Sequence, residues 1–353
     1  MLDSLYEQTL RKKDSINEKI EAYFKEIEFD RSLWIKKSIS DSKMDVTIAG
    51  GDGSLNKKRF LSFIFYAVDA ECLVYNQNGL QSIESSEVDL IPHHRHVEDR
   101  LRNYMGTFEL KTALESFKLY DIDLYLFDGS LLGNLIRPFP LENELTTDLK
   151  EVVKSNFLST LKRELLKEEI EISSLKIRET VEEELGKQKV EAMIYLENME
   201  NLLVIRKLLE HSQQLVGISK TSTGNEYFGH DIPDMAIFEW LDKGTGYSQP
   251  KTIDLSKEVK RDFPILNDFF RNLKFTIFYG RLEPFKNILK FELPYEATEE
   301  EVINILEIIK GNSTLGYPYL LKKAHNDVVI RNKDLKNLSK IIGFLEKSGR
   351  EML

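Results

Sequence analysis

Cysteine and long apolar runs are scarce in this sequence. Its 353 residues include a single cysteine, Cys72, so no disulfide can form within the chain. No apolar run approaches the ~20 residues that a membrane-spanning helix requires. The N-terminal residues, MLDSLYEQTLRKKDS, lack the apolar stretch of a signal peptide. These features predict a cytoplasmic protein without a membrane segment.

Positive charge is also short. The chain has 49 lysines and arginines against 59 aspartates and glutamates, which gives a formal net charge of −10. Such a balance argues against broad, non-specific binding of nucleic acid by the whole surface, although a local basic channel is compatible with it. Hydrophobic residues make up 41% of the chain and charged residues 31%, a composition that predicts a packed core.

The hydrophobic pattern predicts an α/β fold. Residues 3–28 place apolar side chains on one helical stripe, which is typical of a packing or dimerisation helix. Residues 44–54, 59–70 and 71–76 have the composition of strands, with no helix-length segment between them. They therefore predict an antiparallel meander, which a helix over residues 94–119 follows.

A nearly all-apolar strand is predicted next, over residues 121–130, and such strands usually lie in the middle of a sheet. We expect one domain over residues 1–353. It would have an N-terminal helical segment (1–43), an α/β core (44–140 and 214–353) and a charged helical insertion (141–213). Further strands are predicted at 214–222, 235–241, 273–280 and 287–294, and further helices at 299–311, 320–330 and 333–347.

Two aspartates occupy similar motifs, Asp52 in GGDGS and Asp128 in FDGS. Asp-Gly is a common hairpin turn, which is the simplest interpretation of either motif alone. After Asp128, however, SLLGNLIRPFP continues as a helix or loop rather than a returning strand. Carboxylates from neighbouring strands could instead bind Mg(II) or Mn(II), which activate water for phosphodiester hydrolysis. A glycine beside each aspartate would let a phosphate approach the backbone.

A third carboxylate is expected from the helix that precedes Asp128. Most acidic residues on helices are solvated. Glu109 lies in the middle of the helix, in FELKTAL, and its apolar neighbours Phe108 and Leu110 indicate that it lies near the buried face. Glu109 is therefore our choice, and Glu115 is the alternative.

This order of carboxylates resembles that of RNase H-like nucleases, in which a first strand, a first helix and a fourth strand carry the metal ligands. The paired DGS motifs are more specifically similar to those of the NurA family of nucleases. VGISKTS resembles that family's strand with a lysine, and FYGRL followed by ILKFELP resembles its late strand pair. GYPYLLKKAHNDVVI resembles its C-terminal Tyr-Pro…Ala-His signature.

The resemblance implies an RNase H-like mixed sheet flanked by helices, with a helical insertion. It also implies a nuclease of single- and double-stranded DNA that depends on Mn(II), with Mg(II) as the alternative. By position, Asp52, Glu109 and Asp128 would bind the metal, and Tyr317 and His325 would be the C-terminal catalytic pair. Family members are commonly 5′-to-3′ exonucleases, some of which cut single strands internally. They form homodimers and act in DNA-end resection and repair with a hexameric HerA-type ATPase.

Individually, the remaining candidates have ordinary explanations. Lys220 could contact a phosphate of DNA, but exposed lysines at strand ends are common. The same two interpretations, a phosphate contact or an ordinary exposed side chain, apply to Arg281. Without the resemblance, His325 would be a surface or core histidine and Tyr317 a packing residue of a turn.

Two other classes of function compete with a nuclease. IAGGDGSL resembles the GGDGT phosphate-binding motif of diacylglycerol and NAD kinases, in which the motif leads from a strand into a helix. Here the following residues, NKKRFLSFIFYAVDAECLVYN, predict strands instead. A non-enzymatic adaptor would explain the amphipathic N-terminal helix and the charged insertion, but it would leave the carboxylates as turn residues.

Overall fold

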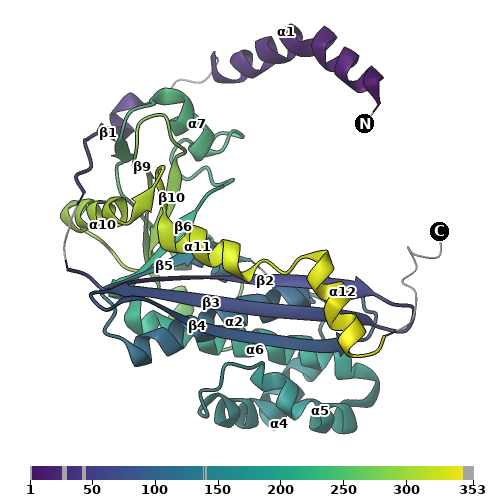
Figure 1. Ribbon diagram of the computed structural model, residues 1–353. Coiled ribbons are helices and arrows are strands. Elements are labelled where there is room, and N and C mark those ends of the chain that lie inside the picture. Colours follow the sequence, from purple (N-terminus) through teal and green to yellow (C-terminus); the bar gives the residue numbers. More distant parts are fainter. Residues whose placement is uncertain (1, 26–29, 42–44, 138, 140, 345–353) are drawn as a thin grey trace.

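A large mixed sheet forms the centre of the protein (Figure 1), whose computed structural model describes residues 2–25, 30–41, 45–137, 139 and 141–344. Within these residues the strand order is β1-β7-β9-β10-β6-β5-β2-β3-β4, and β8 also pairs with β9. The strands of this sheet are β1 (Trp34–Lys36), β2 (Ile48–Arg59), β3 (Ile64–Asn76), β4 (Gly79–Ile91), β5 (Leu124–Asp128), β6 (Leu215–Ser219), β7 (Gly246–Ser248), β8 (Lys251–Asp254), β9 (Lys274–Arg281) and β10 (Leu289–Leu293). The short strands β11 (Ser313–Thr314) and β12 (Tyr317–Pro318) pair separately.

Helices cover both faces of the sheet. In Figure 1, α2 and α6 lie under the long strands β2 to β4, while α11 and α12 lie over them. The helices are α1 (Asp3–Lys25), α2 (Val97–Leu119), α3 (Leu131–Ile136), α4 (Thr147–Leu165), α5 (Arg178–Leu185), α6 (Lys189–Leu208), α7 (Asp234–Leu241), α8 (Leu255–Glu258), α9 (Asn267–Arg271), α10 (Glu299–Gly311), α11 (Tyr319–Val328) and α12 (Asn332–Ile341). In the described ranges, none of the helices is both long and apolar enough to cross a membrane.

The middle of the sheet has the predicted RNase H-like topology. Strands β2, β3 and β4 form an antiparallel meander, and α2 then crosses to β5, which runs parallel to β2. Strand β6 continues in parallel beside β5, and β10 and β9 extend the sheet in antiparallel pairs. The predicted central strand is β5, which is buried along its length between β2 and β6. The predicted α/β fold is confirmed.

Two predicted strands were wrong. Residues 71–76 are the second half of β3 rather than a third strand, and the third strand of the meander is β4. Strand β4 is mostly polar, with exposed and half-buried positions alternating along most of it, so it lacks the apolar run used to find strands. Residues 235–241 belong to helix α7, which begins after Pro233. Short apolar runs are ambiguous between helix and strand, and proline commonly precedes a helix.

The ends of three predicted elements lie outside the described residues. These are the last residues of the N-terminal helix (26–28), the first residue of the first strand (Met44) and the end of the last helix (345–347). The described part of the N-terminal helix agrees with the prediction, whereas α12 ends earlier than predicted, at Ile341.

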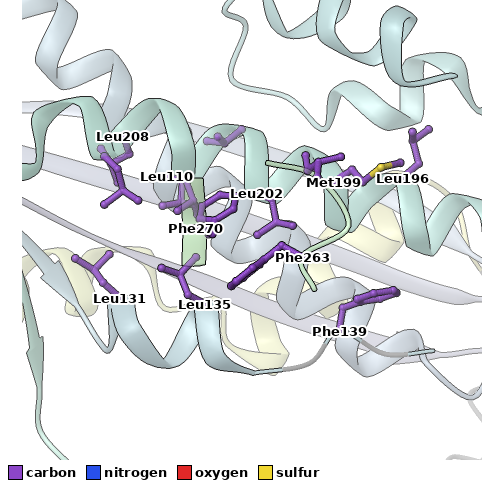
Figure 2. Packing of buried hydrophobic residues seen from close by; sticks show 14 of the residues in the cluster. Leu110, Leu131, Leu135, Phe139, Leu196, Met199, Leu202, Leu208, Phe263 and Phe270 are labelled. Carbon is purple, nitrogen blue, oxygen red and sulfur yellow. The ribbon is translucent and has the colours of Figure 1, made fainter. Parts of the chain in front are cut away.

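The largest hydrophobic cluster lies beneath the sheet and joins the helices that carry the site. Figure 2 shows Leu110 of α2 packed with Leu131 and Leu135 of α3, with Phe263 and Phe270 closing the cluster from a later loop and helix. All five side chains are buried. Burial stabilises by about 25 cal/mol per Å² of apolar surface. This packing holds α2 and α3 in fixed positions relative to the strands between them.

Candidate metal-dependent active site

Strand register brings Asp52 and Asp128 together. The parallel pairing of β2 with β5 ends where Gly51 lies opposite Phe127. Asp52 and Asp128 are the next residues on the two strands, so both project at the point where β5 stops. Their side chains are 14% and 13% exposed, respectively. They therefore form one largely buried anionic site at the end of β5.

Glu109 reaches the site of the two aspartates from helix α2, which lies on the face of the sheet opposite α11. A Cβ atom added at Gly53 would come within 2.6 Å of Glu109 Oε1. Glycine is therefore needed at position 53 because the carboxylate of Glu109 approaches the backbone. The predicted approach of a phosphate at this glycine is not possible here, because Glu109 occupies the space.

Three C-terminal and late-strand residues complete the site through hydrogen bonds to the two aspartates. His325 Nδ1 of α11 lies 2.7 Å from Asp52 Oδ2. Asp128 Oδ2 accepts hydrogen bonds from Lys220 Nζ at 2.8 Å and from the Tyr317 hydroxyl at 3.2 Å. Lys220 follows β6 directly and also lies 4.8 Å from the centre of the Tyr317 ring.

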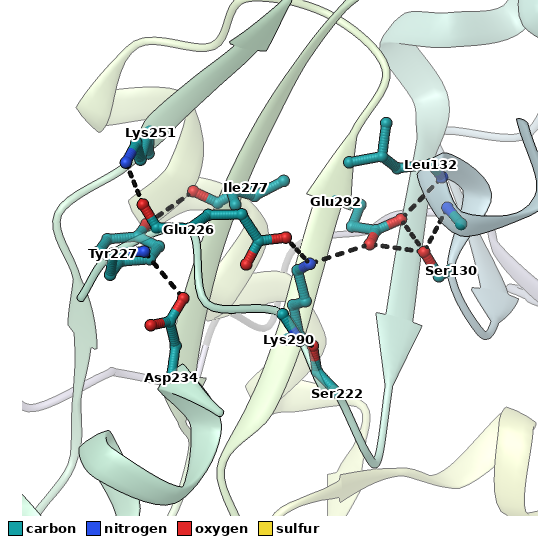
Figure 3. A network of polar contacts seen from close by, with 12 residues as sticks. Ser130, Leu132, Ser222, Glu226, Tyr227, Asp234, Lys251, Ile277, Lys290 and Glu292 are labelled. Carbon is teal, nitrogen blue, oxygen red and sulfur yellow. Dashed lines mark hydrogen bonds and ion pairs between the residues drawn. The ribbon is translucent and has the colours of Figure 1, made fainter. Parts of the chain in front are cut away.

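A buried glutamate fixes the turn that follows Asp128 (Figure 3). Gly129 has a φ of +127°, a left-handed conformation that favours glycine. The next residue, Ser130, donates its hydroxyl proton to Glu292 Oε1 at 2.7 Å, and the Leu132 amide donates to Glu292 Oε2 at 2.9 Å. Glu292 of β10 is fully buried, and Lys290 Nζ lies 3.6 Å from its Oε1. The turn that orients Asp128 is thus tied to the neighbouring part of the sheet.

Lys290 continues this network toward Lys220. Its Nζ pairs with Glu226 Oε1 at 2.9 Å, and Glu226 lies in the loop between β6 and α7, a few residues after Lys220 (Figure 3). Truncating one member of such a buried set would leave an uncompensated charge, which is strongly destabilising. The polar network therefore joins the two segments that carry Asp128 and Lys220.

Burial and mutual repulsion change the ionisation of the site carboxylates. Burial raises the pKa of Glu109 most, the nearby charges of Asp52 and Asp128 add to the shift, and together they bring the pKa to about 8. Burial also raises the pKa of Asp52, although its hydrogen bond with His325 opposes the shift. The pKa of the Tyr317 phenol is raised by burial and by Asp128, so Tyr317 stays a neutral donor. Lys220 pairs with Asp128, but burial and mutual repulsion still raise the pKa of both Asp52 and Glu109.

The donor chemistry of this site fits a hard divalent cation. Carboxylate oxygens are the ligands that Mg(II) and Mn(II) prefer, and a cation between the three groups would relieve the repulsion that raises the pKa of Glu109. Among the described residues, however, no three acidic, histidine or cysteine side chains already form a complete ligand set. Lys220 and His325 each bond one carboxylate oxygen of Asp128 and Asp52, respectively. A metal bound at these two oxygens would compete with both contacts.

The structure gathers six of the seven residues singled out from the sequence, namely Asp52, Glu109, Asp128, Lys220, Tyr317 and His325. The alternative helix carboxylate, Glu115, lies about one and a half turns after Glu109 on α2 and pairs with Lys118 at 2.9 Å. Arg281 requires a correction, because it is fully buried. Its Nε donates to the Lys286 carbonyl at 2.7 Å and its guanidinium pairs with Glu239, so from this position it cannot reach a phosphate of DNA.

Glu292 is the site residue that the sequence reasoning missed. It lies in ILKFELP, where Lys290 and Glu292 are two charged residues in a strand that is buried along its length. Buried acidic residues are rare unless they have partners, so this charged residue was the available signal. Its partners, Ser130 and the Leu132 amide, lie 162 and 160 residues before Glu292 in the sequence.

The position of GGDGS is inconsistent with a kinase phosphate-binding loop. The motif lies inside β2, which continues without a break to Arg59 and pairs with β3 throughout. No helix begins there to receive a phosphate, as the kinase motif requires. The Asp-Gly hairpin interpretation fails for the same reason at Asp52, and after Asp128 the chain enters α3.

Sequence comparison relates most of the chain to one family. The family model described as NurA domain matches residues 46–330. The chain is 32% identical to the probable DNA double-strand break repair nuclease NurA of Methanocaldococcus jannaschii, over 98% of this chain and 89% of that protein. It is 26% identical to the DNA double-strand break repair nuclease NurA of Saccharolobus solfataricus, over 94% of this chain and 88% of that protein.

Solved structures share the fold. The crystal structure of the NurA nuclease from Sulfolobus solfataricus superimposes with a TM-score of 0.74 and 22% identity, over 97% of both chains. A crystal structure of NurA with manganese gives a TM-score of 0.75 at 18% identity, over 96% of this chain and 99% of that one. These matches agree with the α/β architecture described above.

The protonation of Glu109 should link the stability of the metal-free protein to pH. Its pKa is raised to about 8 from the usual value of 4.5, so the folded protein keeps a proton that the unfolded chain releases. Stability from this proton is present at low pH and is lost as the pH rises through this window. In EDTA, the wild type should lose more thermal stability between about pH 5.5 and about pH 8.5 than Glu109→Gln, which cannot ionise.

The matched control is Glu115→Gln on the same helix, which should keep the wild-type pH dependence because its carboxylate pairs with Lys118 outside the site. Thermal unfolding followed by circular dichroism gives the comparison. Equal losses of stability in the wild type and in Glu109→Gln would show that Glu109 is ionised in the metal-free protein.

Proposed function

The chain belongs to the NurA family, and on that premise we propose that it is a nuclease that hydrolyses DNA phosphodiester bonds with divalent metal ions during double-strand break repair. One observation carries this proposal. Asp52, Glu109 and Asp128 come from two strands and a helix that are far apart in the sequence, yet their charges meet at the end of β5. A protein does not bury repelling carboxylates together without a compensating role, and such clusters mark functional sites.

The chain's own residues have distinct tasks in this reaction. Asp52, Glu109 and Asp128 would hold the metal, which when bound activates water and stabilises the leaving oxygen. Lys220, released from Asp128, would offer its ammonium group to a phosphate next to the scissile bond. Tyr317 remains neutral and can donate a hydrogen bond to a phosphate oxygen. His325, whose side chain is 56% exposed, is placed to transfer a proton to or from solvent.

The finer properties follow the family resemblance. We propose Mn(II) as the preferred metal, with Mg(II) as the alternative, and a relative whose structure was solved with manganese supports this order. We further propose 5′-to-3′ exonuclease activity on single- and double-stranded DNA, with internal cleavage of single strands. A purely helical adaptor would not explain why four polar side chains, Lys220, Tyr317, His325 and Glu109, converge on Asp52 and Asp128.

Removing one metal-binding carboxylate should abolish cleavage. We expect Asp52→Asn or Asp128→Asn to lower the rate on labelled DNA with Mn(II) by orders of magnitude, because each change removes a charged oxygen ligand. Both variants should fold, since each relieves repulsion within the cluster. The control is Asp327→Asn, which lies on α11 beside the site but pairs with Lys323. Full activity in either site variant would disprove the metal assignment.

Helix α1 supports the proposal that the protein forms a homodimer. It extends away from the rest of the chain in Figure 1. Its large apolar side chains are exposed, for example Leu5 at 54%, Leu10 at 75% and Tyr23 at 67%. A contiguous apolar stripe of this kind marks an interaction surface, and a two-fold pair of identical chains is the commonest occupant. We propose that a second copy of the chain covers it.

Charge on the apolar stripe should therefore separate the dimer. Light scattering should give about twice the chain mass of 41.1 kDa for the wild type and the single mass for Leu5→Glu/Leu10→Glu. Arg11→Glu, a charge change on the opposite face of α1, serves as control and should stay dimeric. A wild type of single mass, or a double variant that still dimerises, would contradict the proposal.

We also propose that a hexameric HerA-type ATPase feeds DNA to the site. The net charge of −10 repels a polyanion, so the isolated protein should hold DNA weakly, and a partner that retains the strand raises its local concentration. Adding the translocase with ATP should therefore speed duplex degradation, whereas a non-hydrolysable ATP analogue should not. If ATP leaves the rate unchanged while Mn(II) alone supports rapid, processive digestion, the protein works without a feeding partner.

A further inference from the structure

A hollow beside the metal site has no role in the chemistry described above. Its volume is about 390 Å³, within the range of ~300–1,000 Å³ that is usual for small-ligand pockets. One side is formed by Lys220, Tyr317 and His325, the residues that bond the site aspartates. The other side is formed by the loop between β9 and β10 and by the turn between β11 and β12. The hollow therefore adjoins the site of Asp52 and Asp128.

The lining of the hollow is positively charged in a chain that is acidic overall. Three lysines line it, Lys220, Lys286 and Lys322, and no carboxylate does so among the described residues. Lys286 and Lys322 form no ion pair within 4.0 Å with any described residue. Their ammonium groups are thus available for an anion that enters the hollow.

Two apolar side chains project at the rim from strained backbone positions. Phe285 has a φ of +60° and is 83% exposed, and Leu315 has a φ of +56° and is 62% exposed. Left-handed conformations are unfavourable for residues other than glycine and concentrate at binding sites. Burial cannot explain Phe285, since it buries almost none of its ring. A bound molecule that covers the ring would explain it.

Hydrogen bonds and a contact between the two loops hold Phe285 in its exposed position at the rim of the hollow. The Phe285 amide donates to the Lys243 carbonyl at 2.9 Å, and buried Arg281 donates from Nε to the Lys286 carbonyl at 2.7 Å. The two loops also touch, because a Cβ atom at Gly316 would come within 2.8 Å of Lys286 Cβ. Arg281 thus serves the hollow indirectly, by fixing the loop that carries Phe285 and Lys286.

We propose that this hollow binds the nucleotide next to the scissile phosphate in a single strand of DNA, with its base stacked on Phe285 and its flanking phosphates contacted by Lys286 and Lys322. The inference rests on the proposed nuclease function and adds to it a base-stacking subsite. Lysines that follow the backbone and an aromatic ring that stacks on a base are the usual means of binding single strands. In a duplex the faces of internal bases are covered by stacking, so the subsite selects unpaired ends.

Binding of a fluorescent single-stranded oligonucleotide, measured by anisotropy in EDTA so that no strand is cut, tests the contacts. Stacking contributes ~1–3 kcal/mol per base, so Phe285→Ala should raise the Kd about 5- to 150-fold. Phe285→Tyr keeps an aromatic face and should rescue binding, whereas Phe285→Leu should not. Lys286→Ala should reduce the slope of log Kd against log salt by about 0.7, the value for one phosphate of a single strand. Lys257→Ala, an exposed lysine outside the hollow, should leave the slope unchanged.

Photo-crosslinking locates the base directly. An oligonucleotide with 5-iodouracil near its end, irradiated on the wild type, should attach to the tryptic peptide that contains Phe285. The crosslink should persist in Phe285→Tyr and disappear in Phe285→Leu. Attachment to a different peptide, together with an unchanged Kd in Phe285→Ala, would overturn the proposal.

Cleavage of DNA by the wild type with Mn(II) separates this inference from the proposed function. If the wild type cuts DNA and the Phe285→Ala variant binds DNA as tightly as the wild type, the subsite is contradicted but the nuclease proposal is not. A wild type that crosslinks through Phe285 but does not cut DNA contradicts the nuclease proposal and supports the hollow as a binding site for single strands.

Discussion

Repulsion between closely spaced carboxylates is the constraint around which this structure is arranged. Burial of Glu109, together with the nearby charges of Asp52 and Asp128, raises its pKa to about 8. Left free, such groups would separate toward solvent. They stay together because the register of β2 and β5 fixes the two aspartates and because α2 is packed into the core through Leu110, the neighbour of Glu109. The stability of the fold therefore maintains a locally unfavourable arrangement of charge.

The compensation for that arrangement comes from parts of the chain that are distant in sequence. Lys220 and His325 supply donors to Asp128 and Asp52, and Glu292 holds the turn after Asp128 through Ser130. In the metal-free protein these contacts make the site tolerable. A metal that takes the same carboxylate oxygens would compete with these contacts, which would couple metal binding to the orientation of Lys220 and His325. With this coupling, Lys220 would leave Asp128 and contact a phosphate only when the metal is present.

The sequence allowed the centre of this site to be predicted, but not its surroundings. Asp52 and Asp128 stood out because both follow apolar strand segments, and Glu109 because it interrupts an apolar helix face, which are local signals. Tyr317 and His325 were identified only through the family resemblance, because nothing local distinguishes them from surface residues. Strand β4 was missed because most of it is polar, and α7 was mistaken for a strand because its apolar run is short. Arg281 resembled a DNA contact because burial of a charged group by backbone carbonyls has no sequence signature.

The distribution of charge explains how an acidic protein can act on a polyanion. At physiological ionic strength charges are screened beyond about 8 Å, so DNA responds chiefly to the groups that it nearly touches. Lys220, Lys286 and Lys322 lie within one hollow next to the carboxylates, while the excess of negative charge is spread over the rest of the chain. A duplex lying across the surface would meet mostly repulsion, whereas a single strand that enters the hollow meets three lysines and an exposed aromatic ring. Such a surface favours engagement of DNA through a strand end, which is the geometry that an exonuclease requires.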